Sequence, residues 1–131
     1  MAYLPIKKGT ILIPSGTTHA PDKKHLFVIC TDPCTINHQL LVPICTYTNL
    51  LCDNTCLVQP YEHPFLDDVS YVLYRKSRIE EVNVLVSGVN AGKLVPKAEM
   101  NGQSFLRIKN GICRSIQTPR KIKSYFGCDI I

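Results

Sequence analysis

The chain has 131 residues, of which 45% are hydrophobic and 19% are charged, so it is long enough for one domain with its own core and too apolar to be intrinsically disordered. No stretch approaches the roughly 20 apolar residues of a membrane helix, and residues 1–10 lack the apolar core of a secretory signal, so we expect a cytoplasmic protein. The net charge of +5 is uneven: residues 1–74 hold four lysines and six acids, whereas residues 75–131 hold eleven basic residues and four acids.

Short apolar runs separated by turn residues predict strands in the first part of the chain. Residues 11–13 form the first expected strand, which Pro14 ends before a polar loop. The continuous apolar run at 25–30 predicts a buried strand. Residues 39–46 predict a third strand, in which Pro43 indicates a sheet edge or a bulge.

A further strand is predicted around residues 70–74, where polar and apolar side chains alternate. Alternation at a period of two sends Ser70, Val72 and Tyr74 to one face of this strand. Tyr71 and Leu73 then lie on the opposite face.

The pattern changes toward helix in the last third of the chain. Residues 79–89 are ambiguous, because their valines alternate as in a strand. Residues 96–100 have the proline and the acid of a first helical turn, and apolar residues then recur at helical spacing from Phe105 to Ile116. Residues 118–127 carry a threonine cap, a proline and a closing glycine, which predict a last helix.

This order of elements predicts a mainly β fold with one or two α-helices at the carboxyl end. Five or six short strands over about residues 1–95 would form a small, strongly curved sheet or β-barrel, and the helices would lie within about residues 96–127. No repeat, low-complexity segment or linker divides the chain, so residues 1–131 are expected to form a single domain.

The seven cysteines are a high and odd count. Without a secretory signal they are expected to stay reduced, which argues against a disulfide framework. Two pairs, Cys30 with Cys34 and Cys52 with Cys56, share a three-residue spacer and could bind zinc, although two residues is the usual spacer. Cys30 ends an apolar run and is more simply interpreted as a small core residue.

Residues 62–79 combine a histidine, two tyrosines and several cations, and form the best candidate for a site. We expect His63, Tyr74 and Arg75 to share a cationic pocket, with Arg78 close by. For any single residue, the alternative is a half-buried strand that ends in a solvated basic turn.

A second candidate is the basic carboxyl end of the chain. No acid occurs between Met100 and Cys128, whereas six basic residues fall there: Arg107, Lys109, Arg114, Arg120, Lys121 and Lys123. A patch of one sign suits a phosphate backbone or an acidic protein partner, and a solvated face is the alternative.

The order of elements in residues 8–12, 24–31 and 41–46 resembles that of the MazF/PemK-like toxins. In that family, a strand that starts with Gly-Asp is followed by a long loop, a buried strand opening with Arg-Pro, and a Val-Pro-x-Thr strand. The resemblance implies an SH3-like β-barrel with a carboxyl-terminal helix, usually as a homodimer. It also implies metal-independent cleavage of single-stranded RNA, controlled by a cognate antitoxin. The CcdB-like toxins share this barrel but act on DNA gyrase and cleave nothing.

The family's motif residues are replaced here. Its arginine falls on His25 or Lys24. Its threonine falls on Cys45 without a gap, or on Thr46 if one residue is inserted after Pro43.

RNA cleavage without a metal needs a base, an acid and a cation that holds the phosphorane charge. His63 or His25 could move the proton, Arg75 or Arg78 could hold the phosphate, and Thr46 could position it. The other expected RNA-binding residues are Lys24, Tyr71, Tyr74, Arg120, Lys121 and Lys123.

Two hypotheses follow. The first is an endoribonuclease toxin of a type II toxin–antitoxin system that needs no cofactor. The second is a non-catalytic SH3-like barrel that binds nucleic acid or a protein through its basic carboxyl-terminal region.

Overall fold

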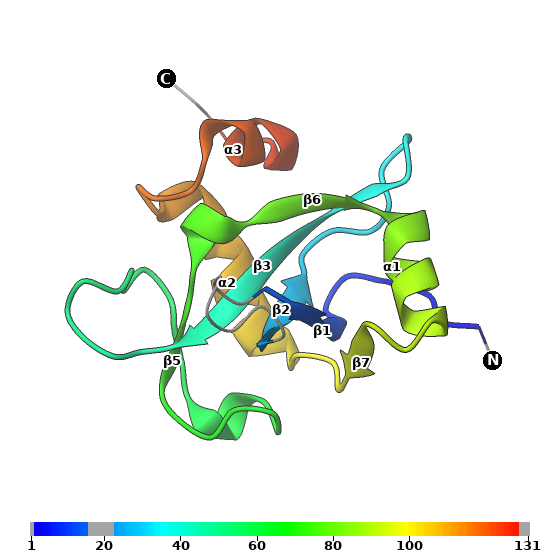
Figure 1. The fold of residues 1–131 in the computed structure, drawn as a ribbon. Helices are drawn as coiled ribbons and strands as arrows, with labels where there is room; N and C mark the ends of the chain where they lie inside the picture. Colours follow the sequence, from blue (N-terminus) through cyan, green and yellow to red (C-terminus); the bar gives the residue numbers. More distant parts are fainter. Residues whose placement is uncertain (1, 16–22, 129–131) are drawn as a thin grey trace.

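The computed structural model describes residues 2–15 and 23–128 (Figure 1). The strands are β1 (Thr10–Pro14), β2 (Lys24–Ile29), β3 (His38–Thr46), β4 (Leu57–Val58), β5 (Ser70–Val72), β6 (Arg78–Glu81) and β7 (Val95–Lys97). The helices are α1 (Val82–Asn90), α2 (Gly102–Arg114) and α3 (Arg120–Phe126), with 3-10 turns η1 (Pro60–Glu62) and η2 (Tyr74–Lys76).

The strands form one antiparallel sheet in the order β4-β5-β3-β2-β1-β7, and β6 pairs with the first half of β3. The strand expected at 70–74 is confirmed as β5 but ends at Val72, since Tyr74 begins the turn η2. The predicted alternation is still seen, because Ser70, Val72 and Tyr74 are buried while Tyr71 and Leu73 are half-buried. The structure thus confirms the predicted fold class, a mainly β fold with helices at the carboxyl end.

Both faces of the sheet are buried, which explains why β2 is continuously apolar from Leu26 to Ile29. Leu26 and Val28 face a core that α2 closes with Phe105, Ile108 and Ile112. Phe27 and Ile29 face the other way, into a smaller core that α1 closes with Leu85. In Figure 1, α2 passes behind β3 and α1 stands at the other side of the molecule.

The position of Pro43 corrects one prediction. β3 is a central strand rather than an edge, since it pairs with β2 on one side and with β5 and β6 on the other. The Pro43 carbonyl accepts from Leu73 N at 2.9 Å, so its missing N–H faces the point where β5 gives way to η2. Because the second partner strand is interrupted there, the proline costs no ladder hydrogen bond.

In the last third of the chain, the structure resolves one ambiguity and corrects one prediction. The ambiguous valines belong to α1, where Val82, Leu85, Val86 and Val89 fit the helical spacing and Val84 is exposed. Residues 96–100 do not start a helix, because Val95–Lys97 pairs with β1 as β7. The helix α2 begins at Gly102 instead, after Asn101, whose Oδ1 accepts from Ser104 N at 2.9 Å.

The last predicted helix is confirmed as α3, which ends at Gly127 with a φ of 86°. The expectation that all cysteines stay reduced is wrong, because Cys113 at the end of α2 and Cys128 after α3 form a disulfide. The remaining five cysteines are free thiols.

The cysteine pairs considered for zinc do not gather in the structure. Cys30 and Cys56 are buried in the larger core, whereas Cys34 and Cys52 are partly exposed. Over residues 2–15 and 23–128, no three histidine, cysteine, aspartate or glutamate side chains cluster in a way that could hold a metal ion. Within the same residues, every helix is too short or too polar to span a bilayer.

Candidate functional site

A cavity of about 360 Å³ opens between β2, the second half of β3 and the turn η2. Phe27, Pro43 and Leu73 form its apolar part. Its polar lining residues are Ser15, His25, Cys45, Arg75, Lys76 and Arg78. None of these described lining residues is acidic, so the cavity is a concave site of one charge sign.

Strand register explains why residues far apart in the chain meet there. Phe27 lies opposite Pro43 in the β2–β3 ladder, so His25 and Cys45, two residues further along, fall opposite each other on the same face. Both line the cavity. The family's arginine could fall on His25 or Lys24, and its threonine on Cys45 or Thr46. Of these four residues, His25 and Cys45 are the two that line the cavity with Arg75.

Lys24 and Thr46 lie one residue further along each strand and point to the opposite face. They line a second cavity of about 390 Å³, which also contains Asp67 and Asp68. The two cavities meet at the strand ends, where both include His25 and Cys45.

His25 is held by a short hydrogen-bonded chain. Its Nδ1 lies 2.6 Å from Ser15 Oγ, and that hydroxyl lies 3.3 Å from the carbonyl oxygen of Ile13. Burial and the nearby Lys23 ammonium lower the pKa of His25 below its ordinary value, so the imidazole is neutral at pH 7. Burial raises the pKa of the Cys45 thiol, which therefore keeps its proton.

The cations of the cavity are positioned by packing. Arg78 Cζ lies 4.6 Å from the centroid of the Phe27 ring, a cation–π contact. Arg75 is exposed on η2, next to Tyr74, which is fully buried and donates from Oη to the Ile108 carbonyl at 2.7 Å. Among the described residues, neither arginine forms an ion pair with a carboxylate, so both remain free to bind an anion.

The predicted pocket of His63, Tyr74 and Arg75 is wrong. His63 is 1% exposed, and its Nε2 lies 2.7 Å from the Ala98 carbonyl and 3.1 Å from Thr10 Oγ1. Its Nδ1 accepts from Phe65 N at 3.0 Å, so both ring nitrogens already have partners. Tyr74 is buried against α2 and cannot contact RNA.

Tyr71 keeps an accessible position. It is half-buried on β5 opposite Cys45, and its ring meets Tyr47 edge-on with centroids 6.1 Å apart. Burial and a hydrogen bond with Cys52 raise the pKa of the Tyr71 phenol to about 12, so it stays protonated at neutral pH.

The basic residues of α3 do not line this cavity. Arg120 and Lys121 are exposed on α3 and Lys123 is half-buried. Tyr125 fixes α3 to the start of β3 by donating to the His38 carbonyl at 2.8 Å. His38 is seven residues from Cys45 along β3, or about 23 Å at the usual strand rise.

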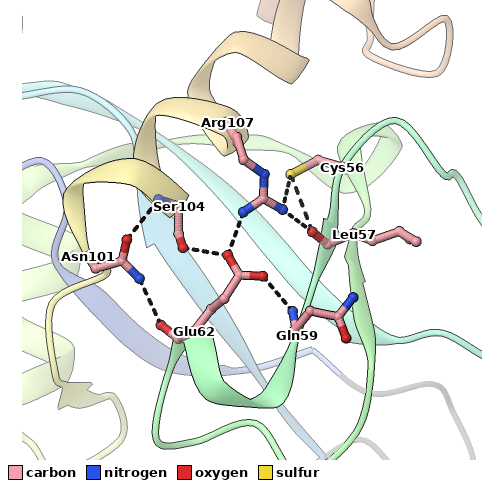
Figure 2. Close-up of polar contacts among 7 residues, drawn as sticks. All are labelled: Cys56, Leu57, Gln59, Glu62, Asn101, Ser104 and Arg107. Carbon is pink, nitrogen blue, oxygen red and sulfur yellow. Dashed lines mark hydrogen bonds and ion pairs between the residues drawn. The ribbon is translucent and has the colours of Figure 1, made fainter.

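A buried carboxylate network, which the sequence analysis missed, joins η1 to α2 (Figure 2). Glu62 Oε1 accepts from Ser104 Oγ and Arg107 Nη1, each at 2.5 Å, and Oε2 accepts from Gln59 N at 2.7 Å. Burial alone would raise the pKa of Glu62, but these hydrogen bonds and the Arg107 charge hold it below its ordinary value. Arg107 is therefore engaged in a structural ion pair. Its spacing of three residues from Ser104 places both side chains on one face of α2, which the sequence could have shown.

The antiparallel sheet with its carboxyl-terminal helices defines the class of fold, and chains of solved structures match it. No protein-family model matches the chain, and no curated protein matches its sequence. A chain of the crystal structure of MazE-MazF (Form-III) from Deinococcus radiodurans is similar over 97% of this chain and 100% of its own length, with a TM-score of 0.53 and 12% identity. At that identity the likeness shows the fold alone.

Proposed function

We propose that the protein is a toxin-like endoribonuclease that cleaves single-stranded RNA without a metal ion, in a toxin–antitoxin system. The observation that carries this proposal is the acid-free cavity in which His25 and Cys45 lie beside Arg75 and Arg78. A neutral imidazole, a protonated thiol and two unpaired guanidinium groups supply the base, the acid and the charge stabilisation that RNA transesterification requires.

The proposed reaction begins with His25. If Nδ1–H donates to Ser15 Oγ and Ser15 donates to the Ile13 carbonyl, Nε2 is left with a free lone pair. Nε2 takes the proton from the ribose 2′-hydroxyl as the 2′-oxygen attacks phosphorus and the bond from phosphorus to the 5′-oxygen breaks. The Cys45 thiol donates its proton to the leaving 5′-oxygen, and the products are a 2′,3′-cyclic phosphate and a 5′-hydroxyl end.

Charge on the phosphorane would be held by the two arginines. Arg75 and Arg78 face the cavity from the turn and from β6, and Lys76 adds a third cation. Lys24 and Thr46, in the neighbouring cavity, would contact the RNA backbone beyond the cleaved bond.

The partner is part of the proposal. The solved neighbour carries both MazE and MazF in its title, and the fold likeness supports a corresponding antitoxin for this chain. A homodimer is proposed on the same resemblance and is tested by the molar mass of the purified protein in solution.

The test is incubation of the purified protein with a single-stranded RNA in EDTA. Cleavage leaving cyclic-phosphate ends is expected, and His25→Ala and Arg75→Gln should each slow it by at least tenfold. His38→Ala and Arg120→Gln are the matched controls, since both residues lie away from the cavity. Intact RNA with wild-type protein, or equal rates in all four variants, would refute the proposal.

The second candidate function is binding without cleavage through the basic surface of α3. The observation that favours it is the exposure of Arg120 and Lys121 on α3, neither of which lines the cavity. Under that function, RNA is shifted in a gel but stays intact, and Arg120→Gln weakens the shift while Arg75→Gln does not.

A further inference from the structure

The cavity around Arg75 continues into a second one on the same face of the sheet. The neighbouring cavity has a volume of about 290 Å³, and Leu73 and Arg75 line both. Tyr71 and Cys52 lie in the new part. We call the two cavities together the Arg75 groove.

Arg75 occupies the junction, with a flat recognition group on each side. On one side is Arg78. The almost fully buried Phe27 ring covers one face of its guanidinium, and Arg78 itself is only half-buried. On the other side is Tyr71, whose ring orientation is fixed by its edge contact with Tyr47. Unpaired bases stack on arginine planes and on tyrosine rings in this way.

The charges of the groove fit the same ligand. Asp53 is the acidic residue that lines the Tyr71 part of the Arg75 groove. It is only 8% exposed, and its carboxylate accepts hydrogen bonds from Ser115 Oγ at 2.6 Å and Thr55 N at 2.9 Å. The unpaired cation Arg75 therefore dominates the junction, where an anion would be held between the Tyr71 ring and the Arg78 guanidinium.

We propose that the Arg75 groove binds two consecutive nucleotides of a single strand, with their linking phosphate on Arg75, one base against Tyr71 and the other on Arg78. The inference rests on the proposed function for the identity of the strand. It adds the number of nucleotides bound and the residue that contacts each base.

The experiment uses two all-deoxy tetranucleotides, which lack the 2′-hydroxyl and cannot be cleaved, with 2-aminopurine at the second or the third position. Wild-type protein should change the fluorescence of both probes. Tyr71→Leu should remove the change at one position, and Arg78→Leu at the adjacent position. Arg75→Gln should weaken binding of both probes about tenfold and reduce the slope of log affinity against log salt by about 0.7.

Matched controls are Tyr61→Leu, a tyrosine that is 86% exposed outside the groove, and Arg120→Gln on α3. Tyr71→Phe keeps the ring and should keep the signal. If Tyr71→Leu does not fold, photo-crosslinking of wild-type protein to a 5-iododeoxyuridine probe, mapped by mass spectrometry, should label Tyr71.

The inference would be overturned if the protein bound neither probe, or if both variants lost the fluorescence change at the same probe position. It would also be overturned if the crosslink labelled only residues other than Tyr71. If the protein binds the probes in this register but does not cleave the matching RNA, the proposed enzyme is refuted and the nucleotide-binding groove is supported. If it cleaves RNA at the same rate with Tyr71→Leu and Arg78→Leu, the groove is refuted and the proposed enzyme is supported.

Discussion

Gly111→Ala is the substitution for which the structure makes the sharpest prediction. In an isolated helix, alanine would stabilise α2 by about 1 kcal/mol relative to glycine. Here, a Cβ atom at position 111 would lie 2.0 Å from Tyr74 Oη and 2.6 Å from Tyr74 Cζ. Tyr74 is fully buried and its hydroxyl donates to Ile108 O at 2.7 Å, so the ring has no open space into which it can move.

The magnitude follows from three contributions. Overpacking of a buried ring costs about 1–3 kcal/mol, and loss of the buried hydrogen bond costs about 1–3 kcal/mol more. Subtracting the gain of about 1 kcal/mol in helix propensity leaves a net destabilisation of roughly 1–5 kcal/mol, a large part of the 5–15 kcal/mol typical of a domain. Urea unfolding followed by circular dichroism measures this directly.

Gly102→Ala is the matched control, because a Cβ there meets nothing within 4 Å at the start of the same helix. It should change the free energy of unfolding by no more than about 0.5 kcal/mol. In a Tyr74→Leu background, Gly111→Ala should become neutral or stabilising, since the colliding ring is gone. An unfolding midpoint for Gly111→Ala at or above that of wild type would refute the packing of Tyr74 on α2.

Three further predictions concern the contacts that hold the helices and the site. Glu62→Gln should lower the free energy of unfolding at pH 7 by about 1–3 kcal/mol. Because the folded pKa of Glu62 is depressed, its contribution is present above the unfolded pKa and is lost as pH falls through the folded pKa, so the urea midpoints of wild type and variant should converge in acid. Replacing both Cys113 and Cys128 by serine should cost up to about 3 kcal/mol, and a reductant should lower the melting temperature of wild type but not of the variant. His63→Ala should lower the melting temperature, since Ala98 and Thr10 lose a buried partner, yet leave the pH dependence of RNA cleavage unchanged. That pH profile should instead rise through a pKa below 6.5, set by His25 as the base, and a profile that His25→Ala leaves intact would contradict this assignment.

The strands that could be predicted from the sequence are those whose apolar pattern has one interpretation. β1 and β2 have both faces buried, so their apolar runs are continuous and end at polar residues. The segment Val82–Asn90 has two interpretations, because valines at even positions fit a strand while Val82, Leu85, Val86 and Val89 fit a helix. Contact with the smaller core decides in favour of the helix, and that contact is not visible in a local window.

β7 could not be predicted for a different reason. It has three residues, and its pairing partner β1 lies more than 80 positions earlier in the chain. Pro96 and the following acid are compatible with a helix start, and only the non-local pairing of Val95 with Leu12 excludes it. Short strands of this kind are fixed by the sheet rather than by their own sequence.

The sequence analysis named part of the candidate site but grouped its residues differently. His25, Arg75 and Arg78 were named there, Cys45 was not given a role, and the expected pocket joined Arg75 to His63 and Tyr74 instead. Tyr74 and Arg75 are consecutive in the 3-10 turn η2, where three residues complete a turn, so Tyr74 packs on α2 while Arg75 turns outward. The partners of Arg75 come from the ends of β2 and β3, and only the strand register reveals them.

The turn η2 couples the position of Arg75 in the site to the packing of α2. Tyr74 and Arg75 are consecutive in η2, and Ser77 reinforces the turn by donating from N and Oγ to the Tyr74 carbonyl at 3.1 and 2.7 Å. Because the Tyr74 ring fits over Gly111, any shift of α2 moves the backbone that carries Arg75. A Gly111→Ala variant that still folds should therefore lose RNA affinity along with stability, whereas Gly102→Ala should keep both, although neither residue lines the groove.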